Sequence, residues 1–240
     1  MNPSKKPPEQ KQRDEPVGGR APVLVVATSN EHKVEEISSC LATLAGRALS
    51  VRGAGLLPPG PVPDETGETF LENARIKARA CAARAFLLPP GERPDWVVAD
   101  DSGLEVDALG GAPGVHSARF AGPGARDSDN NRKLLDALAG LPAEKRGASF
   151  VCVLVALEVR GEGPEAGDIH VEGRTRGRIL DAPRGRGGFG YDPLFLVPEL
   201  GKTYAELEPE EKNGTSHRGK ALAALQKSLW PALEERGRAT

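Results

Sequence analysis

Two neighbouring carboxylates, Asp100 and Asp101, are the clearest sign of chemistry in this sequence. They follow the apolar run Trp96–Ala99, which is typical of a buried strand, and they precede Ser102 and Gly103. In α/β folds ligands bind beyond the carboxyl ends of strands, because helices cover the faces of the sheet. Two adjacent acids repel each other unless a cation or a proton intervenes, so the pair predicts a ligand site. Asp, Ser and Gly also favour turns, and a strand-ending turn is therefore the alternative interpretation.

A second candidate site lies at the start of the helix that apolar spacing predicts from Glu31 to Ala45. This helix follows the apolar strand Val23–Ala27, and Ser29 or Asn30 is a natural N-cap for it. Free backbone N–H groups and the helix dipole attract anions there, and Lys33 adds a full positive charge. The segment suits a phosphate, although an ordinary capped helix is the alternative. The glycine and lysine pattern of a P-loop is absent.

Further carboxylates gather in a loop rich in proline and glycine, at Asp64, Glu65 and Glu68. A helix is predicted to follow from Thr69 to Leu87, with a capping box at its start. Asn73 and Lys77 are neighbours on its surface, because they lie four positions apart. That spacing alone favours exposure to solvent over a place in a binding site.

Two later segments contain residues suited to binding an aromatic or carbonyl-bearing ligand. In the loop Arg184–Pro193, glycines surround Phe189 and Tyr191, and a ring held among glycines can present its face to a base. The segment leading into the last predicted helix contains Lys212, His217 and Arg218. Because positive charge at a helix start opposes the helix dipole, these residues favour an anionic or carbonyl-bearing partner. A plain glycine-rich loop and solvated surface charge are the alternatives.

The remaining elements favour a mixed sheet. Leu49–Arg52 is consistent with a short strand, and a short helix capped by Ser128 precedes two long strands. These strands, Ser149–Val159 and Ile169–Leu180, are expected to pair antiparallel across a turn at 161–167.

Length and composition limit the class of protein. The 240 residues include a proline-rich, charged segment at 1–20, which predicts a disordered tail. We expect a single domain at 21–232 and a short C-terminal tail at 233–240. The net charge of −2 and the 4% of aromatic residues disfavour nucleic-acid binding.

The cellular setting is predicted from what the sequence lacks. No apolar run approaches the roughly 18 residues of a membrane span, and the N-terminus lacks the apolar core of a secretory signal. Three cysteines, Cys40, Cys81 and Cys152, are odd in number and widely spaced, which argues against disulfides and zinc sites. We therefore expect a cytoplasmic protein.

Five segments occur together in one order: ATSNEHK, DETGETFLENA, ADDSGLEVDALGGAPGVHSARFAG, GGFGYDPLF and EEKNGTSHRGKAL. Together they resemble the inosine/xanthosine triphosphate pyrophosphatase family, from about Pro22 to Trp230. The resemblance implies hydrolysis of ITP, dITP and XTP to the monophosphate and pyrophosphate with Mg²⁺, which clears deaminated purines from the nucleotide pool. It also implies a homodimer of elongated α/β subunits, each with two lobes, a long mixed twisted sheet and an active site in the cleft between the lobes.

The same resemblance assigns roles to single residues. Asp101 matches the catalytic proton acceptor and a metal contact, and Asp64 matches a second metal-associated carboxylate. Ser102 matches a substrate contact beside Asp101. The remaining substrate-binding positions are those of the phosphate loop, the base and ribose segment, and the contacts to the 6-oxo purine edge: Thr28, Ser29, Asn30, Glu31, His32 and Lys33; Phe189, Gly190, Tyr191 and Asp192; Lys212, His217 and Arg218.

Two positions depart from the family pattern. Ser29 and His32 stand where the first loop often has glycine, so its backbone path is expected to differ slightly. Asp64 is one methylene shorter than the usual Glu, so its metal contact could run through water. A non-catalytic nucleotide sensor and a pyrophosphatase for modified pyrimidine triphosphates are the alternative functions.

Overall fold

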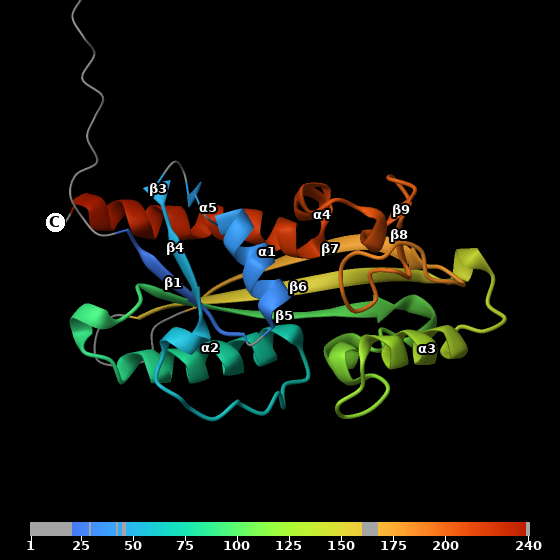
Figure 1. The fold of residues 1–240 in the computed structure, drawn as a ribbon, viewed down its shortest axis with the longest axis horizontal. Coiled ribbons are helices and arrows are strands. Elements are labelled where there is room, and N and C mark those ends of the chain that lie inside the picture. Colours follow the sequence, from blue (N-terminus) through green and yellow to red (C-terminus); the bar gives the residue numbers. More distant parts are fainter. Residues whose placement is uncertain (1–20, 29, 42, 45–46, 160–167, 239–240) are drawn as a thin grey trace, which may run out of the picture.

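A seven-stranded mixed sheet, in the order β4-β1-β5-β6-β7-β8-β9, forms the centre of the molecule (Figure 1). The computed structural model describes residues 21–28, 30–41, 43–44, 47–159 and 168–238. The parallel part consists of β4 (Ser50–Gly53), β1 (Val23–Val26) and β5 (Trp96–Val106). The antiparallel part consists of β6 (Gly147–Glu158), β7 (Ile169–Ile179), β8 (Phe195–Val197) and β9 (Lys202–Thr203). The predicted mixed sheet is confirmed.

Helices cover both faces of this sheet. On one face lie α1 (Glu31–Leu41), α4 (Pro209–Thr215) and α5 (His217–Arg238) (Figure 1). On the other face lie α2 (Phe70–Phe86) and α3 (Asp127–Ala137), one beside the parallel part and one toward the far end of the long strands. Strands β5, β6 and β7 run through both halves and join them into an elongated two-lobed α/β fold, as predicted.

Alternation of side chains along β5 divides the core in two. Trp96 and Val98 pack into the cluster that includes residues of α1 and α5, whereas Val97 and Ala99 pack into the cluster that includes α2. Successive residues of a strand point to opposite faces of a sheet. Neighbouring residues of β5 therefore meet different helices, which determines the surroundings of the two acids that follow.

Strand β5 does not end at Ala99. It continues to Val106 and pairs with β6 along its whole length, from Trp96 opposite Glu158 to Val106 opposite Ala148. The expectation that Asp100 and Asp101 lie in a loop beyond the strand is therefore wrong. The long ladder of backbone hydrogen bonds outweighs the turn preference of these residues. However, the acids do lie just beyond the end of β1, whose last partner on β5 is Val98.

Other element boundaries also differ from the predictions. Helix α1 ends at Leu41 rather than Ala45, because Thr43–Leu44 forms strand β2 and pairs with β3 (Arg47–Ala48). Residue 128 does not cap α3, since that helix begins at Asp127. The capping box of α2 and the antiparallel pairing of β6 with β7 are confirmed.

Some predictions concern segments outside the described residues. These are the tail at 1–20 and the turn at 161–167. At the other end of the chain, α5 continues to Arg238 and thus through most of the segment 233–240.

Cys40, Cys81 and Cys152 are free thiols, as expected. Within the described ranges, every helix is too short or too polar to cross a membrane.

Helix α5 packs closely on the sheet at a glycine, and this contact yields a test of the fold. A Cβ atom at Gly173 of β7 would lie 2.0 Å from the carbonyl oxygen of His217 and 2.5 Å from the backbone nitrogen of Ala221. Because backbone atoms cannot move aside cheaply, Gly173→Ala should lower the free energy of unfolding by about 1–3 kcal/mol, measured by urea denaturation. Gly91→Ala, with no atom within 4 Å, is the control. Equal stability of the two variants would contradict this packing.

Candidate active site

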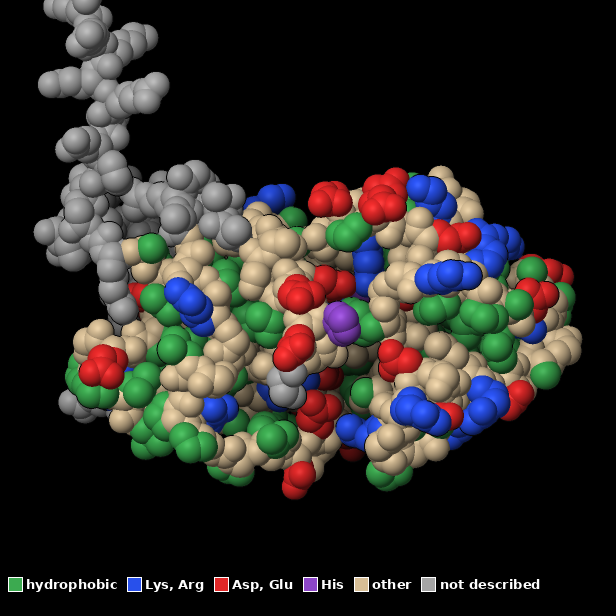
Figure 2. Space-filling model, in the orientation of Figure 1, with side chains coloured by type: hydrophobic (Ala, Val, Ile, Leu, Met, Phe, Trp, Pro, Cys, Tyr) green, Lys and Arg blue, Asp and Glu red, His purple; other side chains and the backbone are tan. Residues whose placement is uncertain are grey.

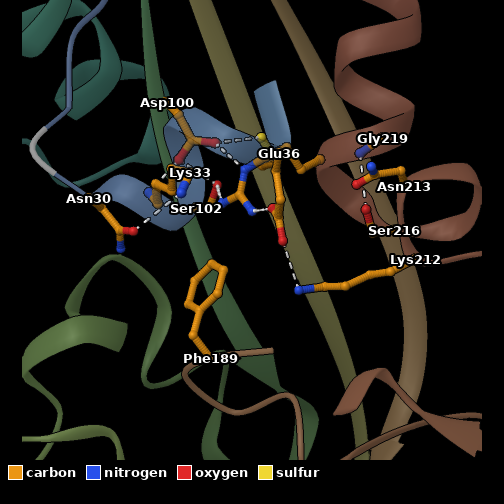
Figure 3. A network of polar contacts seen from close by, with 12 residues as sticks. Asn30, Lys33, Glu36, Asp100, Ser102, Phe189, Lys212, Asn213, Ser216 and Gly219 are labelled. Carbon is orange, nitrogen blue, oxygen red and sulfur yellow. Dashed lines mark hydrogen bonds and ion pairs between the residues drawn. The ribbon is translucent and has the colours of Figure 1, made fainter. Parts of the chain in front are cut away.

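Asp100 lies on the α1 and α5 face of the sheet, where cations surround its buried carboxylate (Figure 3). One oxygen accepts hydrogen bonds from Lys33 Nζ and from Ser102 Oγ, the latter at 2.9 Å. The other accepts from Arg218 Nε at 2.9 Å and from the thiol of Cys152 at 3.2 Å. Burial opposes ionisation, but Arg218 and Lys33 outweigh it and hold the pKa of Asp100 well below its usual value. Asp100 is therefore an ionised anchor for two cations.

Glu36 extends this network along α1. Its carboxylate accepts hydrogen bonds from Arg218 Nη1 and, at 2.9 Å, from Lys212 Nζ (Figure 3). Lys212 also donates to Asp192 at 2.8 Å. Three carboxylates thus orient the three cations Lys33, Lys212 and Arg218, which come from α1, α4 and α5. The side chains of all three cations are largely buried, so the charges are held in fixed positions.

Asp101 points to the opposite face of the sheet and meets α2. Its Oδ1 atom accepts a hydrogen bond from Lys77 Nζ at 2.6 Å, and the same ammonium lies 3.2 Å from Glu65. Burial raises the pKa of Asp101 above its usual value, although Lys77 opposes this shift. The Oδ2 atom is buried and has no hydrogen-bond partner within the part of the chain that the structure describes. This orphaned acceptor is available to a proton donor or to a cation.

The loop that contains Asp64 and Glu65 lies on the α2 face of the sheet, near Asp101, but the side chain of Asp64 is exposed to solvent. Glu65 lies near Lys77 and 3.6 Å from Arg119, whereas Asp64 is exposed. Asn73, buried on α2, holds the loop through Gly67, whose N–H donates to the Asn73 side chain at 2.8 Å. The loop therefore brings the carboxylate of Glu65 to the ammonium that holds Asp101, but it does not place Asp64 in contact with another charged group among the described residues.

A cavity of about 150 Å³ lies beside these charges, between α1 and the glycine-rich loop. Figure 2 shows acidic and basic side chains gathered near the middle of the molecular surface that faces the viewer. The predicted residues that line the cavity are Asn30, Lys33, Ser102, Phe189, Gly190, Tyr191, Asp192, Lys212, His217 and Arg218. The structure thus brings together most of the positions expected to bind substrate. A larger cavity of about 370 Å³ shares no lining residue with this one.

The other predicted residues surround the start of α1. Thr28 Oγ1 accepts a hydrogen bond from the N–H of Asn30 at 3.1 Å, and Asn30 in turn accepts one from the N–H of Lys33 at 3.2 Å. Glu31 and His32 are exposed on the first turn, and Ser29 lies outside the described residues. The expected helix start is therefore present, with Asn30 as the residue whose side chain bonds into the first turn.

Two aromatic residues of the cavity differ in their freedom to contact a ligand. Tyr191 is buried and donates its hydroxyl to the carbonyl of Ser117 at 2.9 Å, so that hydroxyl is already occupied. His217 is also buried and stacks on Phe150 with ring centres 4.7 Å apart. Burial, reinforced by Arg218, lowers the pKa of His217 well below its usual value. Its Nδ1 atom has no hydrogen-bond partner in the described ranges, so a neutral imidazole remains available to a ligand.

Sequence reasoning missed two residues of this site. Lys77 was expected to face solvent, yet its ammonium lies between Asp101 and Glu65. Its position on α2, one turn after the buried Asn73, was the available signal. Glu36 was not considered, although it lies three residues after Lys33 and therefore close to it on the surface of α1.

Comparisons with known proteins extend over nearly the whole described chain. Residues 24–228 match the sequence model of the Ham1 family. A "dITP/XTP pyrophosphatase" from Clostridium perfringens is 47% identical over 206 residues, covering 86% of this chain and 96% of the relative. One of the same name from Geobacillus kaustophilus is 49% identical, covering 90% and 98%. The solved structure of the Staphylococcus aureus Ham1 protein is 38% identical, with a TM-score of 0.72, and covers 88% of this chain and 99% of that one.

The pairing of Asp100 with Arg218 predicts a pH-dependent loss of stability. Arg218→Met leaves a buried carboxylate poorly paired, so it should lower the free energy of unfolding by about 3–5 kcal/mol at pH 7. In the wild type, ionised Asp100 stabilises the fold above its unfolded pKa, and this contribution is lost as the pH falls through its lower folded pKa. In the variant, burial favours protonation, so the stability deficit should shrink between pH 7 and pH 4. Urea denaturation at both pH values measures it.

The double variant Asp100→Asn/Arg218→Met is the control for this test. It removes both charges, so its deficit at pH 7 should be smaller than that of Arg218→Met alone. A deficit that is the same at pH 7 and pH 4 would show that Arg218 acts through packing rather than through the charge of Asp100.

Proposed function

This chain belongs to the Ham1 family, and we propose that it hydrolyses non-standard purine nucleoside triphosphates to the monophosphate and pyrophosphate. The substrates are dITP, XTP and ITP, so the activity clears deaminated purines from the nucleotide pool. The observation that carries this proposal is the match, along nearly its whole length, to proteins named dITP/XTP pyrophosphatase. The chemistry of the site agrees with it, because the cavity combines oriented cations, an aromatic ring and a buried carboxylate.

The triphosphate is expected to bind at the start of α1. Lys33 and the backbone N–H groups of the first turn present positive charge there, and Asn30 orders that turn. Hydrolysis spreads additional negative charge over the reacting phosphoryl group. Groups that are already oriented stabilise such charge without reorganising, and in many enzymes this effect supplies most of the rate enhancement. The ion pair with Asp100 keeps Lys33 in position before the substrate arrives.

Asp101 is the proposed proton acceptor for the attacking water. Its pKa is raised by burial, which makes it a better base than an exposed carboxylate. Its Oδ2 atom is available, while Lys77 holds the other oxygen and so sets the orientation of the carboxyl group. Asp100 is less suited to accept the proton of the water, because four groups already donate hydrogen bonds to its carboxylate.

We also propose that Asp101 and Asp64 hold Mg²⁺. The orphaned oxygen of Asp101 is the kind of ligand this ion prefers, and Mg²⁺ usually takes only one or two carboxylates, with phosphates and water completing its shell. When bound, the ion would neutralise phosphate charge.

Selectivity for a 6-oxo purine is proposed to come from His217 and Arg218. A hydrogen-bond donor that faces position 6 of the purine can donate to the carbonyl of hypoxanthine or xanthine, whereas the amino group of adenine offers it no acceptor. An unpaired buried donor costs about 1–3 kcal/mol, which would reject ATP. Two observations support this role: the Nδ1 atom of the neutral His217 has no hydrogen-bond partner among the described residues, and the guanidinium of Arg218 is held in place by Asp100. Guanine also has a 6-carbonyl, so rejection of GTP depends on its 2-amino group.

The assembly and location of the enzyme are proposed from the family resemblance. We propose a homodimer that acts in the cytoplasm, where the nucleotide pool is found. The free thiols of Cys40, Cys81 and Cys152 are consistent with a reducing compartment.

A product assay tests the proposed function directly. Purified protein with ITP and Mg²⁺ should release IMP and pyrophosphate, with little release from ATP or GTP, and the activity should disappear when Mg²⁺ is chelated. Pyrophosphate and orthophosphate are assayed separately. Orthophosphate as the first product would mean that the wrong bond was assigned, and tight ITP binding without turnover would favour a sensor.

Replacing the proposed base should remove turnover but not substrate binding. Asp101→Asn should lower kcat for ITP at least ~100-fold, because general-base catalysis contributes factors of about 10²–10⁴. The KM or the dissociation constant for ITP should change far less. Asp136→Asn, an exposed acid on α3, is the matched control. Turnover near the wild-type rate in Asp101→Asn would remove this residue from the chemistry.

A further inference from the structure

An aromatic ring that lines the cavity, that of Phe189, stacks on a second ring from α1. The imidazole of His32, on the first turn of α1, stacks on the ring of Phe189 with centres 5.8 Å apart and planes inclined by 12°. Within the described ranges, His32 has no hydrogen-bond or ion-pair partner, and its side chain is exposed. Stacking on Phe189 is thus its one specific contact with the rest of the described molecule.

The two rings come from different elements, and Phe189 is the one that lines the cavity. His32 lies on α1, next to the phosphate-binding Lys33. Phe189 lies in the glycine-rich loop, which is held to α3 and to itself. The N–H of Gly190 donates to Asp127 at 2.6 Å, and the N–H of Phe189 donates to Asp192 at 2.9 Å. The loop that carries Phe189 is therefore held in place by hydrogen bonds, and His32 approaches its ring from the other lobe.

The residues proposed to recognise the base lie around the same ring. The Nζ atom of Lys212 is 4.9 Å from the centre of Phe189, and the guanidinium carbon of Arg218 is 5.7 Å from it. Both cations lie over the ring of Phe189, so a base that binds against this ring would have hydrogen-bond donors close to it. Two rings that hold a base between them lie about 7 Å apart, twice the contact distance of about 3.5 Å. The present distance of 5.8 Å between the ring centres is an upper limit on the spacing of the two planes, so the rings must separate by at least about 1 Å to admit a base.

We propose that His32 is a second stacking wall, which holds the purine between its imidazole and the ring of Phe189. This inference rests on the proposed function, because it assigns a role in base binding to a residue that the sequence places in the phosphate loop. The near-parallel rings carry it, together with the lack of another specific contact between His32 and the described residues. Every base has an aromatic face, so this wall adds affinity for the base without distinguishing one purine from another.

Binding of IMP and of inorganic tripolyphosphate separates this role from a role in phosphate binding. IMP contains the base, whereas tripolyphosphate has only the phosphates. His32→Ala should weaken IMP binding by about tenfold in isothermal titration, a factor within the range for loss of one stacking partner. The inhibition constant of tripolyphosphate should stay within twofold of the wild type. His32→Phe, which keeps a flat ring, should restore IMP binding.

Kinetics with ITP provide a second reading of the same variant. His32→Ala should raise the KM for ITP by a similar factor and leave kcat within about twofold. Glu35→Ala, an exposed residue further along the same helix, is the control, and both variants should unfold at the wild-type temperature. Equal weakening of IMP and tripolyphosphate would overturn the proposal, as would unchanged or tighter IMP binding. Because IMP binding requires no turnover, the proposal can fail while the hydrolase function stands, and the reverse also holds.

Discussion

The buried carboxylate of Asp100 is the constraint on which the active site depends. A charge taken out of water is strongly unfavourable unless cations and hydrogen-bond donors compensate it. Here the compensation comes from Lys33, 67 residues earlier in the chain, and from Arg218, 118 residues later. The ion pairs that compensate the buried charge of Asp100 therefore also hold α1 and α5 on the same face of the sheet.

This arrangement orients the cations before a ligand binds. Arg218 is held by Asp100 and Glu36, and Lys212 by Glu36 and Asp192. Long basic side chains otherwise lose considerable rotamer freedom when they bind a ligand, and ion pairs within the protein reduce that loss. Three carboxylates pair with the three cations, so this network of ion pairs carries almost no net charge.

The adjacent acids act on different faces because they occupy consecutive positions of one strand. Asp100 meets the cations of α1 and α5, and Asp101 meets Lys77 of α2. Both lie where β1 has ended, so beyond Val98 the strand β5 no longer has β1 beside it. The structure thus separates an ionised anchor from a carboxyl group that has one oxygen without a hydrogen-bond partner among the described residues, although the sequence presents the two as equivalent neighbours.

The sequence by itself predicted the longer helices and strands and the mixed sheet, because apolar periodicity and helix caps are local patterns. Its short motifs resemble those of a known family, and that resemblance pointed to most residues of the cavity. It could not determine that β5 continues through Asp100 to Val106, since pairing with β6 along the whole strand outweighs local turn preference. Nor could it show that Lys77 and Glu36 belong to the site, because a helix surface residue meets its partner only when distant elements pack together. The contact between His32 and Phe189 likewise joins two segments far apart in the chain. Neighbouring residues are enough to indicate which chemical groups a segment offers. Strand pairing and helix packing between distant segments decide on which face of the sheet each charge lies and which partner it contacts.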